Sequence, residues 1–176
     1  LKVNLGNLDK VMEGAFRPGH FTGVIQVVSK LFDIVNPDKA YFGQKDFQQC
    51  LILTQLINSL KMPVELVMCP IYREPHGLAM SSRNVRLNPQ IRQKAGAIYA
   101  SLQYAAAMIN ILTPQKIQQA ATAALNTIEG FNVDYFLLLN ADNLKPITPE
   151  THANRMVIIT AVIVDGVRLL DNMVIS

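Results

Sequence analysis

Apolar residues recur three and four positions apart in two stretches of the first third of the chain. This spacing places them on one side of an α-helix and predicts amphipathic helices over residues 21–34 and 47–60. The expected inward side of the first helix consists of Val24, Val27, Val28, Leu31, Phe32 and Val35. That of the second helix consists of Cys50, Leu53, Leu56, Ile57 and Leu60.

Short apolar runs at residues 39–42 and 64–69 flank the second helix and indicate buried strands. Asn36-Pro37-Asp38 is expected to end the first helix and Met62-Pro63 the second, because the residue before a proline disfavours helical conformation. A strand–helix–strand order implies parallel strands with a right-handed crossover. We therefore expect half of a doubly wound, Rossmann-like α/β sheet, which binds ligands at the carboxyl ends of its strands. Those ends carry Gly43 and Pro70.

The pattern changes after residue 86. Asn88-Pro89 and Thr113-Pro114 each combine a capping side chain with a proline suited to the first turn of a helix. Asp165-Gly166 is typical of a two-residue β-hairpin. Two helices and then three strands are predicted at residues 90–111, 114–128, 133–139, 155–164 and 167–171. We therefore expect a partial nucleotide-binding domain over residues 1–86 and a small α+β domain over residues 87–176.

Half of the 176 residues are hydrophobic, which is enough for a packed core. The 16 basic and 13 acidic residues give a net charge of +3 without a basic cluster, so we expect no nucleic-acid partner. No apolar run reaches transmembrane length, so we expect no membrane partner. Cys50 and Cys69 are expected to be free and buried, because no Cys/His spacing suggests a metal site, and a reducing cytoplasm fits this expectation.

Two short segments carry residues suited to binding phosphate. In the first, Gly43 permits a sharp turn, while Lys45 supplies a cation and Asp46 an N-cap carboxylate at the start of a helix, where backbone N–H groups bind anions. The second, Ser81-Ser82-Arg83, offers two hydroxyls and a guanidinium. Each segment alone is more typical of an ordinary cap or turn. Together, in one α/β chain, they predict a nucleotide held from both sides.

The two segments belong to a longer pattern, whose parts are Arg17-Pro18-Gly19-His20-Phe21-Thr22-Gly23-Val24, Phe42-Gly43-Gln44-Lys45-Asp46-Phe47-Gln48-Gln49, Arg73-Glu74, Gly77-Leu78-Ala79-Met80-Ser81-Ser82-Arg83-Asn84 and Leu170-Asp171-Asn172. By this pattern the chain resembles the pantothenate synthetase (pantoate–β-alanine ligase) family of the nucleotidyltransferase superfamily. The resemblance covers essentially the whole chain. It implies the C-terminal half of the nucleotide-binding domain, followed by a small α+β C-terminal domain.

The resemblance also implies an AMP-forming ligase of pantothenate and coenzyme A biosynthesis. ATP and pantoate would give pantoyl adenylate and pyrophosphate, and β-alanine would then release pantothenate and AMP. Mg²⁺ would be bound through the ATP phosphates, without a metal site built by the protein. The enzyme would be a cytoplasmic homodimer.

The family's functional residues match particular positions of this sequence. Lys45, Ser81 and Arg83 would be the catalytic residues. Gln49 would bind pantoate, since its amide can donate to and accept from a hydroxy acid. The ATP-binding residues would be Gly43, Gln44, Lys45, Asp46, Tyr72, Met80, Ser81, Ser82 and Arg83. A stripe that could contact the two methyl groups of pantoate, or simply pack in the core, consists of Val24, Val27 and Val28.

The chain departs from the family pattern in several places. The family's N-terminal histidine motif is absent, so we expect the chain to be inactive by itself. Gln44 replaces a frequent glutamate, and Tyr72 stands where the adenine pocket is often aliphatic, which suggests backbone contacts at both positions. His20 is expected to cap the first helix or to bond backbone, and His76 and His152 to be solvated. Two alternatives stay open: another nucleotidyltransferase of the superfamily, or a non-catalytic dimerisation and interaction fragment.

Overall fold

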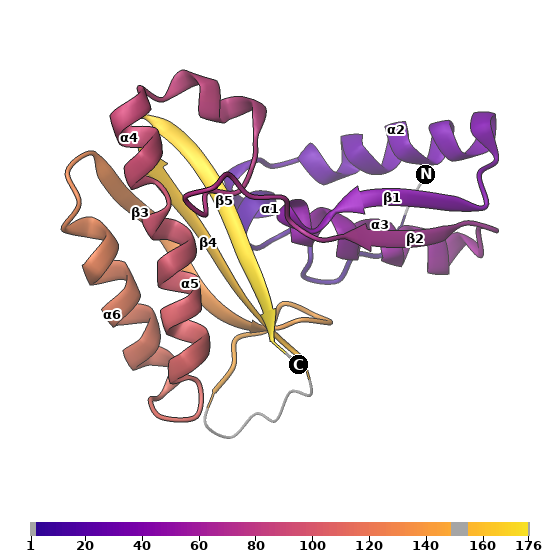
Figure 1. The fold of residues 1–176 in the computed structure, drawn as a ribbon. Coiled ribbons are helices and arrows are strands. Elements are labelled where there is room, and N and C mark those ends of the chain that lie inside the picture. Colours follow the sequence, from indigo (N-terminus) through magenta and orange to yellow (C-terminus); the bar gives the residue numbers. More distant parts are fainter. Residues whose placement is uncertain (1–2, 149–154, 176) are drawn as a thin grey trace. The chain divides into compact units, whose positions relative to one another are not determined.

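The computed structural model describes residues 3–148 and 155–175 and divides into two compact units, Leu1–Pro70 and Ile71–Ser176 (Figure 1). His152 lies outside the described residues. The division at Pro70 comes earlier than the change of pattern expected after residue 86, because Leu78 and Leu87 are both buried in the core of the second unit. The assignment of the segment up to residue 86 to a nucleotide-binding domain stays a prediction.

The first unit combines helices with a small parallel sheet, as expected for an α/β fold. Its elements are α1 (Met12–Phe16), α2 (His20–Val35), β1 (Lys39–Gly43), the 3₁₀ turn η1 (Gln44–Asp46), α3 (Phe47–Leu60) and β2 (Glu65–Cys69). β1 and β2 pair in parallel, with Lys39 opposite Glu65 and Gly43 opposite Cys69. The predicted strand–helix–strand unit is therefore confirmed.

Both long helices of the first unit end where the sequence predicts. Asn36 and Lys61 occupy the C-cap positions of α2 and α3 with left-handed backbone, at φ values of 47° and 50°. The Asn36 N–H donates to the carbonyl oxygen of Phe32 at 2.8 Å, which satisfies a carbonyl that the helix leaves unpaired. Pro37 and Pro63 then prevent either helix from continuing.

The buried side of α2 differs from the predicted one. Phe21, Ile25 and Phe32 are buried in clusters that also contain residues of α3. Three residues of the predicted inward side are instead mostly exposed, namely Val27, Leu31 and Val35. Apolar residues occupy most of the circumference of α2, so their spacing fits two sides of the helix and does not choose between them. In α3 the prediction was wrong only for Leu60, the last residue, which is 40% exposed.

The second unit is built on an antiparallel sheet of strand order β3-β4-β5. Its elements are η2 (Ser82–Arg86), α4 (Pro89–Lys94), α5 (Ala97–Met108), α6 (Pro114–Asn126), β3 (Phe131–Asn140), β4 (Met156–Val164) and β5 (Val167–Ile175). The predicted hairpin joins β4 to β5, where Asp165 and Gly166 both have positive φ, at 46° and 77°. Such φ values suit the tight turns that match the twist of a hairpin. The small α+β unit is therefore confirmed, with a last strand longer than expected.

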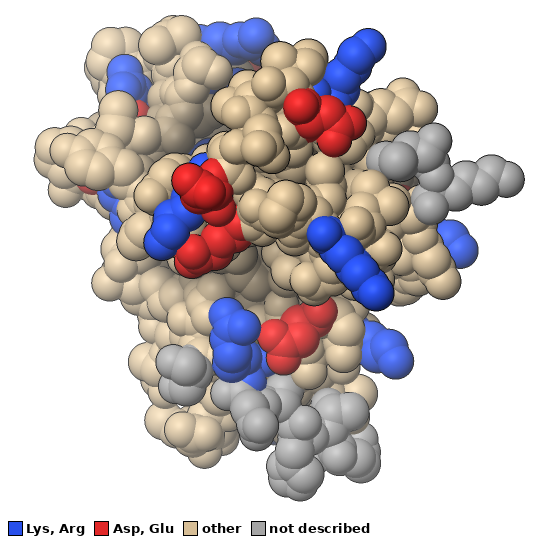
Figure 2. Space-filling model, turned by 90° about the vertical axis from the view of Figure 1, so that its right-hand side faces the viewer, with Lys and Arg blue, Asp and Glu red and all other residues tan. Residues whose placement is uncertain are grey.

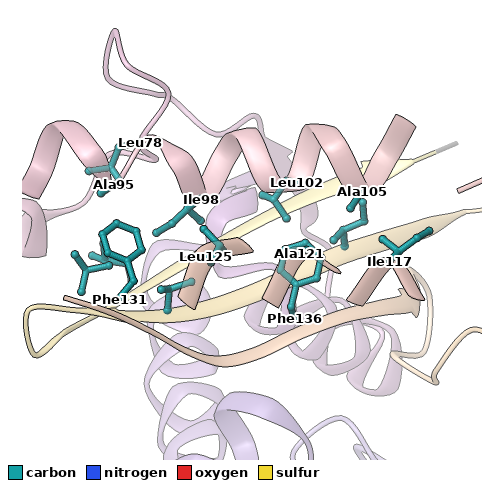
Figure 3. Close-up of a cluster of buried hydrophobic side chains, with 14 of the residues drawn as sticks. Leu78, Ala95, Ile98, Leu102, Ala105, Ile117, Ala121, Leu125, Phe131 and Phe136 are labelled. Atoms are coloured by element: carbon teal, nitrogen blue, oxygen red, sulfur yellow. The ribbon is translucent and has the colours of Figure 1, made fainter. Parts of the chain in front are cut away.

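Helices α5 and α6 pack on the sheet, and their apolar side chains meet those of β3 in one cluster (Figure 3). Its members include Leu78, Ala95, Ile98, Leu102, Ala105, Ile117, Ala121, Leu125, Phe131 and Phe136. Burying one leucine-sized side chain stabilises a fold by about 1.5–3 kcal/mol. The buried side chains of this cluster therefore contribute substantially to the stability of the second unit.

The helix predicted over residues 90–111 is two helices. α4 ends at Lys94 and α5 begins at Ala97, with a turn at Gly96 between them. A Cβ atom at Gly96 would overlap the backbone carbonyl of His76, so only glycine lets the two segments approach this closely. Apolar periodicity continues across the break, which is why the sequence pattern predicts a single helix.

The described surface is mixed in charge. On the face shown in Figure 2, Lys and Arg side chains are separated by uncharged surface and several lie beside Asp or Glu. Among the described residues, no helix combines the length and apolar character needed to cross a bilayer. No group of three or more His, Cys, Asp or Glu side chains in the same residues could hold a metal ion.

Candidate functional site

The first phosphate-type turn lies between β1 and α3. Gly43 ends β1 with φ −72° and ψ 130°, a conformation that any residue adopts. A Cβ atom added there would meet no atom of the chain within 4 Å. The backbone conformation of this turn therefore does not itself require a glycine. The space in front of Gly43 is open to a group from outside the chain.

Several polar residues follow Gly43 at the start of α3. Lys45 and Gln49 are half-buried and lie one helical turn apart, while Asp46 is exposed. Asp46 occupies the N-cap position, but its carboxylate accepts no capping hydrogen bond, so the predicted cap is not formed. Uncapped N–H groups at a helix start keep their positive electrostatic potential and attract anions.

The cysteines flank the same turn. Cys50 is completely buried, and its thiol donates to the carbonyl oxygen of Gly43 at 3.6 Å. Burial raises the pKa of the Cys50 thiol to about 12, so the thiol is protonated at neutral pH. Cys69, which pairs with Gly43 in the sheet, is half-buried, so the predicted complete burial holds for Cys50 alone.

Gln48 is a structural residue to which the sequence analysis gave no role. Its Nε2 donates to the carbonyl oxygens of Leu8 and Val11 at 2.6 and 2.9 Å, and its Oε1 accepts from the N–H of Glu13 at 3.1 Å. One buried amide thus fastens the segment before α2 to the first turn of α3. The sequence offers one signal for this role, because Gln48 stands between Phe47 and Cys50, which are both on the buried side of the helix.

Two other predictions for the first unit change. In the valine stripe, Val24 and Val28 pack beside the core, whereas Val27 is 60% exposed. His20 begins α2 without capping it, and its Nε2 lies 3.1 Å from Nη1 of Arg17. Burial, and then the charge of Arg17, lowers the pKa of His20.

The second phosphate-type segment follows a short two-stranded turn in the second unit. The N–H of Met80 donates to the carbonyl oxygen of Tyr72 at 2.9 Å, and Arg73 and Ala79 form an isolated antiparallel bridge. The Tyr72 side chain is 78% exposed and that of Met80 49% exposed. The Tyr72 carbonyl thus pairs with Met80 within the chain, and a backbone contact of Tyr72 with a nucleotide stays a prediction.

Ser81 caps the 3₁₀ turn η2, because its Oγ accepts from the N–H of Arg83 at 3.2 Å. The Arg83 side chain is exposed, and its Nη1 donates to the carbonyl oxygen of Arg168 at 3.2 Å. Ser82 is also exposed. Ser82 and Arg83 therefore face solvent, whereas Ser81 is half-buried, and the binding of phosphate by this turn stays a prediction.

A buried ion pair supports this segment. Arg73 donates to both carboxylate oxygens of Asp171, at 2.7 and 3.0 Å, and to the carbonyl oxygen of Gly77 at 3.0 Å. Its guanidinium stacks 3.7 Å from the centre of the Tyr99 ring. Asp171 is 2% exposed, in the middle of β5. An acidic residue directly after the apolar pair Leu169-Leu170 was the signal for this ion pair.

Glu74 forms a second buried network. Its carboxylate accepts two hydrogen bonds of 2.8 Å from Arg92 and one of 2.7 Å from Asn84. These hydrogen bonds hold the pKa of Glu74 below its usual value, and those from Arg92 have the largest effect. His76 Nε2 lies 3.6 Å from this carboxylate, and its side chain is only 13% exposed. The expectation that His76 is solvated was therefore wrong.

The predicted site residues form two groups. Gly43, Gln44, Lys45, Asp46 and Gln49 come together within the first unit, at the start of α3. Tyr72, Met80, Ser81, Ser82 and Arg83 come together within the second unit.

The family profile described as pantoate-beta-alanine ligase matches residues 1–174. The chain belongs to the pantoate–β-alanine ligase family. It is 45% identical over 177 residues to pantothenate synthetase of Cytophaga hutchinsonii, an alignment that covers 99% of this chain and 62% of that protein. The chain thus spans 62% of the length of this curated relative.

Solved structures of the pantoate–β-alanine ligase family have the same fold. Pantothenate synthetase from Thermus thermophilus superposes with a TM-score of 0.87 at 38% identity, covering 96% of this chain and 60% of that one. The enzyme from Francisella tularensis, complexed with beta-gamma ATP and beta-alanine, superposes with a TM-score of 0.69 at 29% identity, covering 95% of this chain and 55% of that one. The α/β fold class is therefore confirmed.

Proposed function

We propose that this chain carries the ATP- and pantoate-binding residues of an AMP-forming pantoate–β-alanine ligase. In the reaction, a carboxylate oxygen of pantoate attacks the α-phosphorus of ATP, and pyrophosphate leaves. The amine of β-alanine then attacks the acyl carbon of the adenylate, and AMP leaves. The family to which the chain belongs supports this assignment.

The observation that carries the proposal is the arrangement at the start of α3. Gly43 faces open space, and the half-buried Lys45 and Gln49 follow it closely in the chain, four residues apart. A cation at a helix start suits the phosphates of ATP, while an amide one turn further suits the hydroxyl and carboxylate of pantoate. One short segment can therefore bring the nucleophile and the nucleotide together.

The second group would act on the same charges. Arg83 is a planar fork of donors that matches phosphate oxygens, and the hydroxyls of Ser81 and Ser82 can donate to the same oxygens. Lys45 and Arg83 would stabilise the charge that develops on the leaving pyrophosphate. Asp46, Gln44, Met80 and Tyr72 would complete the ATP-binding set.

ATP as the nucleotide is supported by the complex of the Francisella tularensis relative. Mg²⁺ would accompany ATP through its phosphate oxygens, because Mg²⁺ is usually held by substrate phosphates together with one or two carboxylates. We also propose a cytoplasmic homodimer, as the family resemblance implies.

Two variants test the residue assignments, one by the rate of pyrophosphate release and one by separate titrations of ATP and pantoate. Both are made in a chimera in which this chain replaces the matching 62% of the Cytophaga hutchinsonii enzyme. Lys45→Ala should slow pyrophosphate release by about a hundredfold, which corresponds to about 3 kcal/mol of lost transition-state stabilisation. Lys39→Ala is the matched control, because Lys39 is an exposed lysine at the start of β1, the strand that precedes the turn with Lys45. Equal rates for Lys45→Ala and the control would refute the role of Lys45.

Gln49→Ala in the same chimera should weaken pantoate binding and leave ATP binding nearly unchanged. Gln55→Ala is its control, since Gln55 is an exposed glutamine of the same helix. Loss of ATP affinity as large as the loss of pantoate affinity would show that Gln49 does not lie in a pantoate pocket.

A further inference from the structure

Asn84 lies within the 3₁₀ turn η2, directly after Ser81, Ser82 and Arg83, and is 1% exposed. Its Nδ2 donates to Oε1 of Glu74 at 2.7 Å and to the carbonyl oxygen of Ala79 at 3.1 Å. Its backbone N–H donates to the carbonyl oxygen of Ser81 at 3.0 Å. A single buried residue therefore binds the segment before the turn and the turn itself.

The acceptor of this bond is itself firmly held. Glu74 has a side chain that is 9% exposed, and Arg92 of α4 donates to it through Nε and Nη2 at 2.8 Å each. A carboxylate with such donors stays ionised, and hydrogen bonds to an ionised acceptor are the stronger kind. Asn84 is thus anchored to α4 through Glu74.

The segment Ser81–Arg83 depends on this anchor because Ser81 is only half-buried and the next two residues face solvent. Ser82 and Arg83 are exposed, and the bond from the Arg83 N–H to Ser81 Oγ lies within the turn. The bond from Arg83 Nη1 to Arg168 fixes only the end of a long, exposed side chain. Removing the Asn84 amide would leave the backbone of the turn with few buried contacts, and such segments open readily.

We propose that Asn84 and Glu74 are positioning residues, which hold the Ser81–Arg83 turn in the geometry that binds the phosphates of ATP. The assignment of ATP to this turn rests on the proposed function, whereas the anchoring itself does not. Neither side chain needs to touch the nucleotide. Their effect would pass through the backbone of the turn, because a phosphate clamp works only when its donors are already placed.

Amide hydrogen exchange of the 176-residue chain tests the anchoring without any ligand. In Asn84→Ala, amides of residues 82–87 should exchange about tenfold faster, while those of β4 keep their rates. Glu74→Gln keeps the shape of the side chain and loses the charge, so it should accelerate the same amides to a smaller extent. Arg155→Ala is the control, because it removes an exposed ion pair of the same unit.

Unchanged exchange at residues 82–87 in both variants would overturn the proposal, as would equal acceleration in β4, which would mean a general loss of stability. If Asn84→Ala fails to fold, Glu74→Gln decides between these outcomes by the same comparison.

Titration of Mg·ATP into the chain then tests the functional step. We expect Asn84→Ala to raise the dissociation constant about tenfold.

An unchanged dissociation constant in Asn84→Ala, with exchange accelerated, would overturn the positioning role for ATP. If the wild-type chain binds no ATP, the ATP-binding part of the proposed function fails for this chain, and the exchange result still decides the anchoring. The two failures are therefore distinguishable.

Discussion

Removing the carboxylate of Asp171 should destabilise the second unit strongly. Asp171→Ala deletes two charged hydrogen bonds from Arg73, at 2.7 and 3.0 Å, and leaves a guanidinium that is 18% exposed without its anion. Breaking a buried ion pair from one side costs about 3–5 kcal/mol. Because Arg73 keeps its bond to Gly77 and its stacking on Tyr99, we expect the lower end, about 3 kcal/mol.

Urea unfolding, followed through hydrogen exchange of the β4 amides, measures this loss in the second unit alone. Asp142→Ala is the matched control, since its pair with Arg155 is exposed and should contribute about 0–1 kcal/mol. The double variant Arg73→Met/Asp171→Ala should lose less than the sum of the single variants, because the two residues interact directly. If Asp171→Ala lost no more stability than the control, the ion pair would not support the segment from Tyr72 to Met80.

Two further predictions concern titrating groups. At pH 8 iodoacetamide should label Cys69 and spare Cys50, because complete burial and a pKa of about 12 keep the Cys50 thiol protonated and inaccessible. Mass spectrometry, with a denatured control, measures the labelling of both cysteines. Equal labelling of the two in the native chain would contradict the packing of α3. Glu74 has a lowered pKa when folded, so its stabilisation is present above its usual pKa of 4.5 and is lost as pH falls through the folded value. Wild type should therefore lose more stability than Glu74→Gln below pH 4.5 in urea titrations, and parallel curves would contradict the network.

The sequence predicts the helices, strands and turns of both units well where a few neighbouring residues determine the backbone conformation. The first helix ends at Asn36, as predicted, Asn88 caps α4, and the Asp165-Gly166 hairpin forms with positive φ values. These features depend on one or two residues and their own backbone. The break at Gly96 and the exposed side of α2 depend instead on distant segments, which periodicity within one helix cannot report.

The candidate site divides in the same way. The residues that would meet ATP and pantoate stand in short contiguous motifs, so the sequence locates Lys45, Gln49 and Arg83 directly. The residues that support the second motif are far apart in sequence, as in the pair of Arg73 with Asp171. Asn84 stands inside a recognised motif, yet its burial and its bond to Glu74 emerge only from the fold.

Formation of AMP tests the central claim most directly. The chimera that carries this chain in place of the matching part of the Cytophaga hutchinsonii enzyme is supplied with ATP, Mg²⁺, pantoate and β-alanine. We predict that AMP and pantothenate appear in equal amounts, that AMP formation requires pantoate, and that Lys45→Ala abolishes most of it while Lys39→Ala does not. A folded chimera that makes no AMP, under conditions in which the unaltered relative does, would contradict the claim that this chain carries the ATP- and pantoate-binding residues of a pantoate–β-alanine ligase.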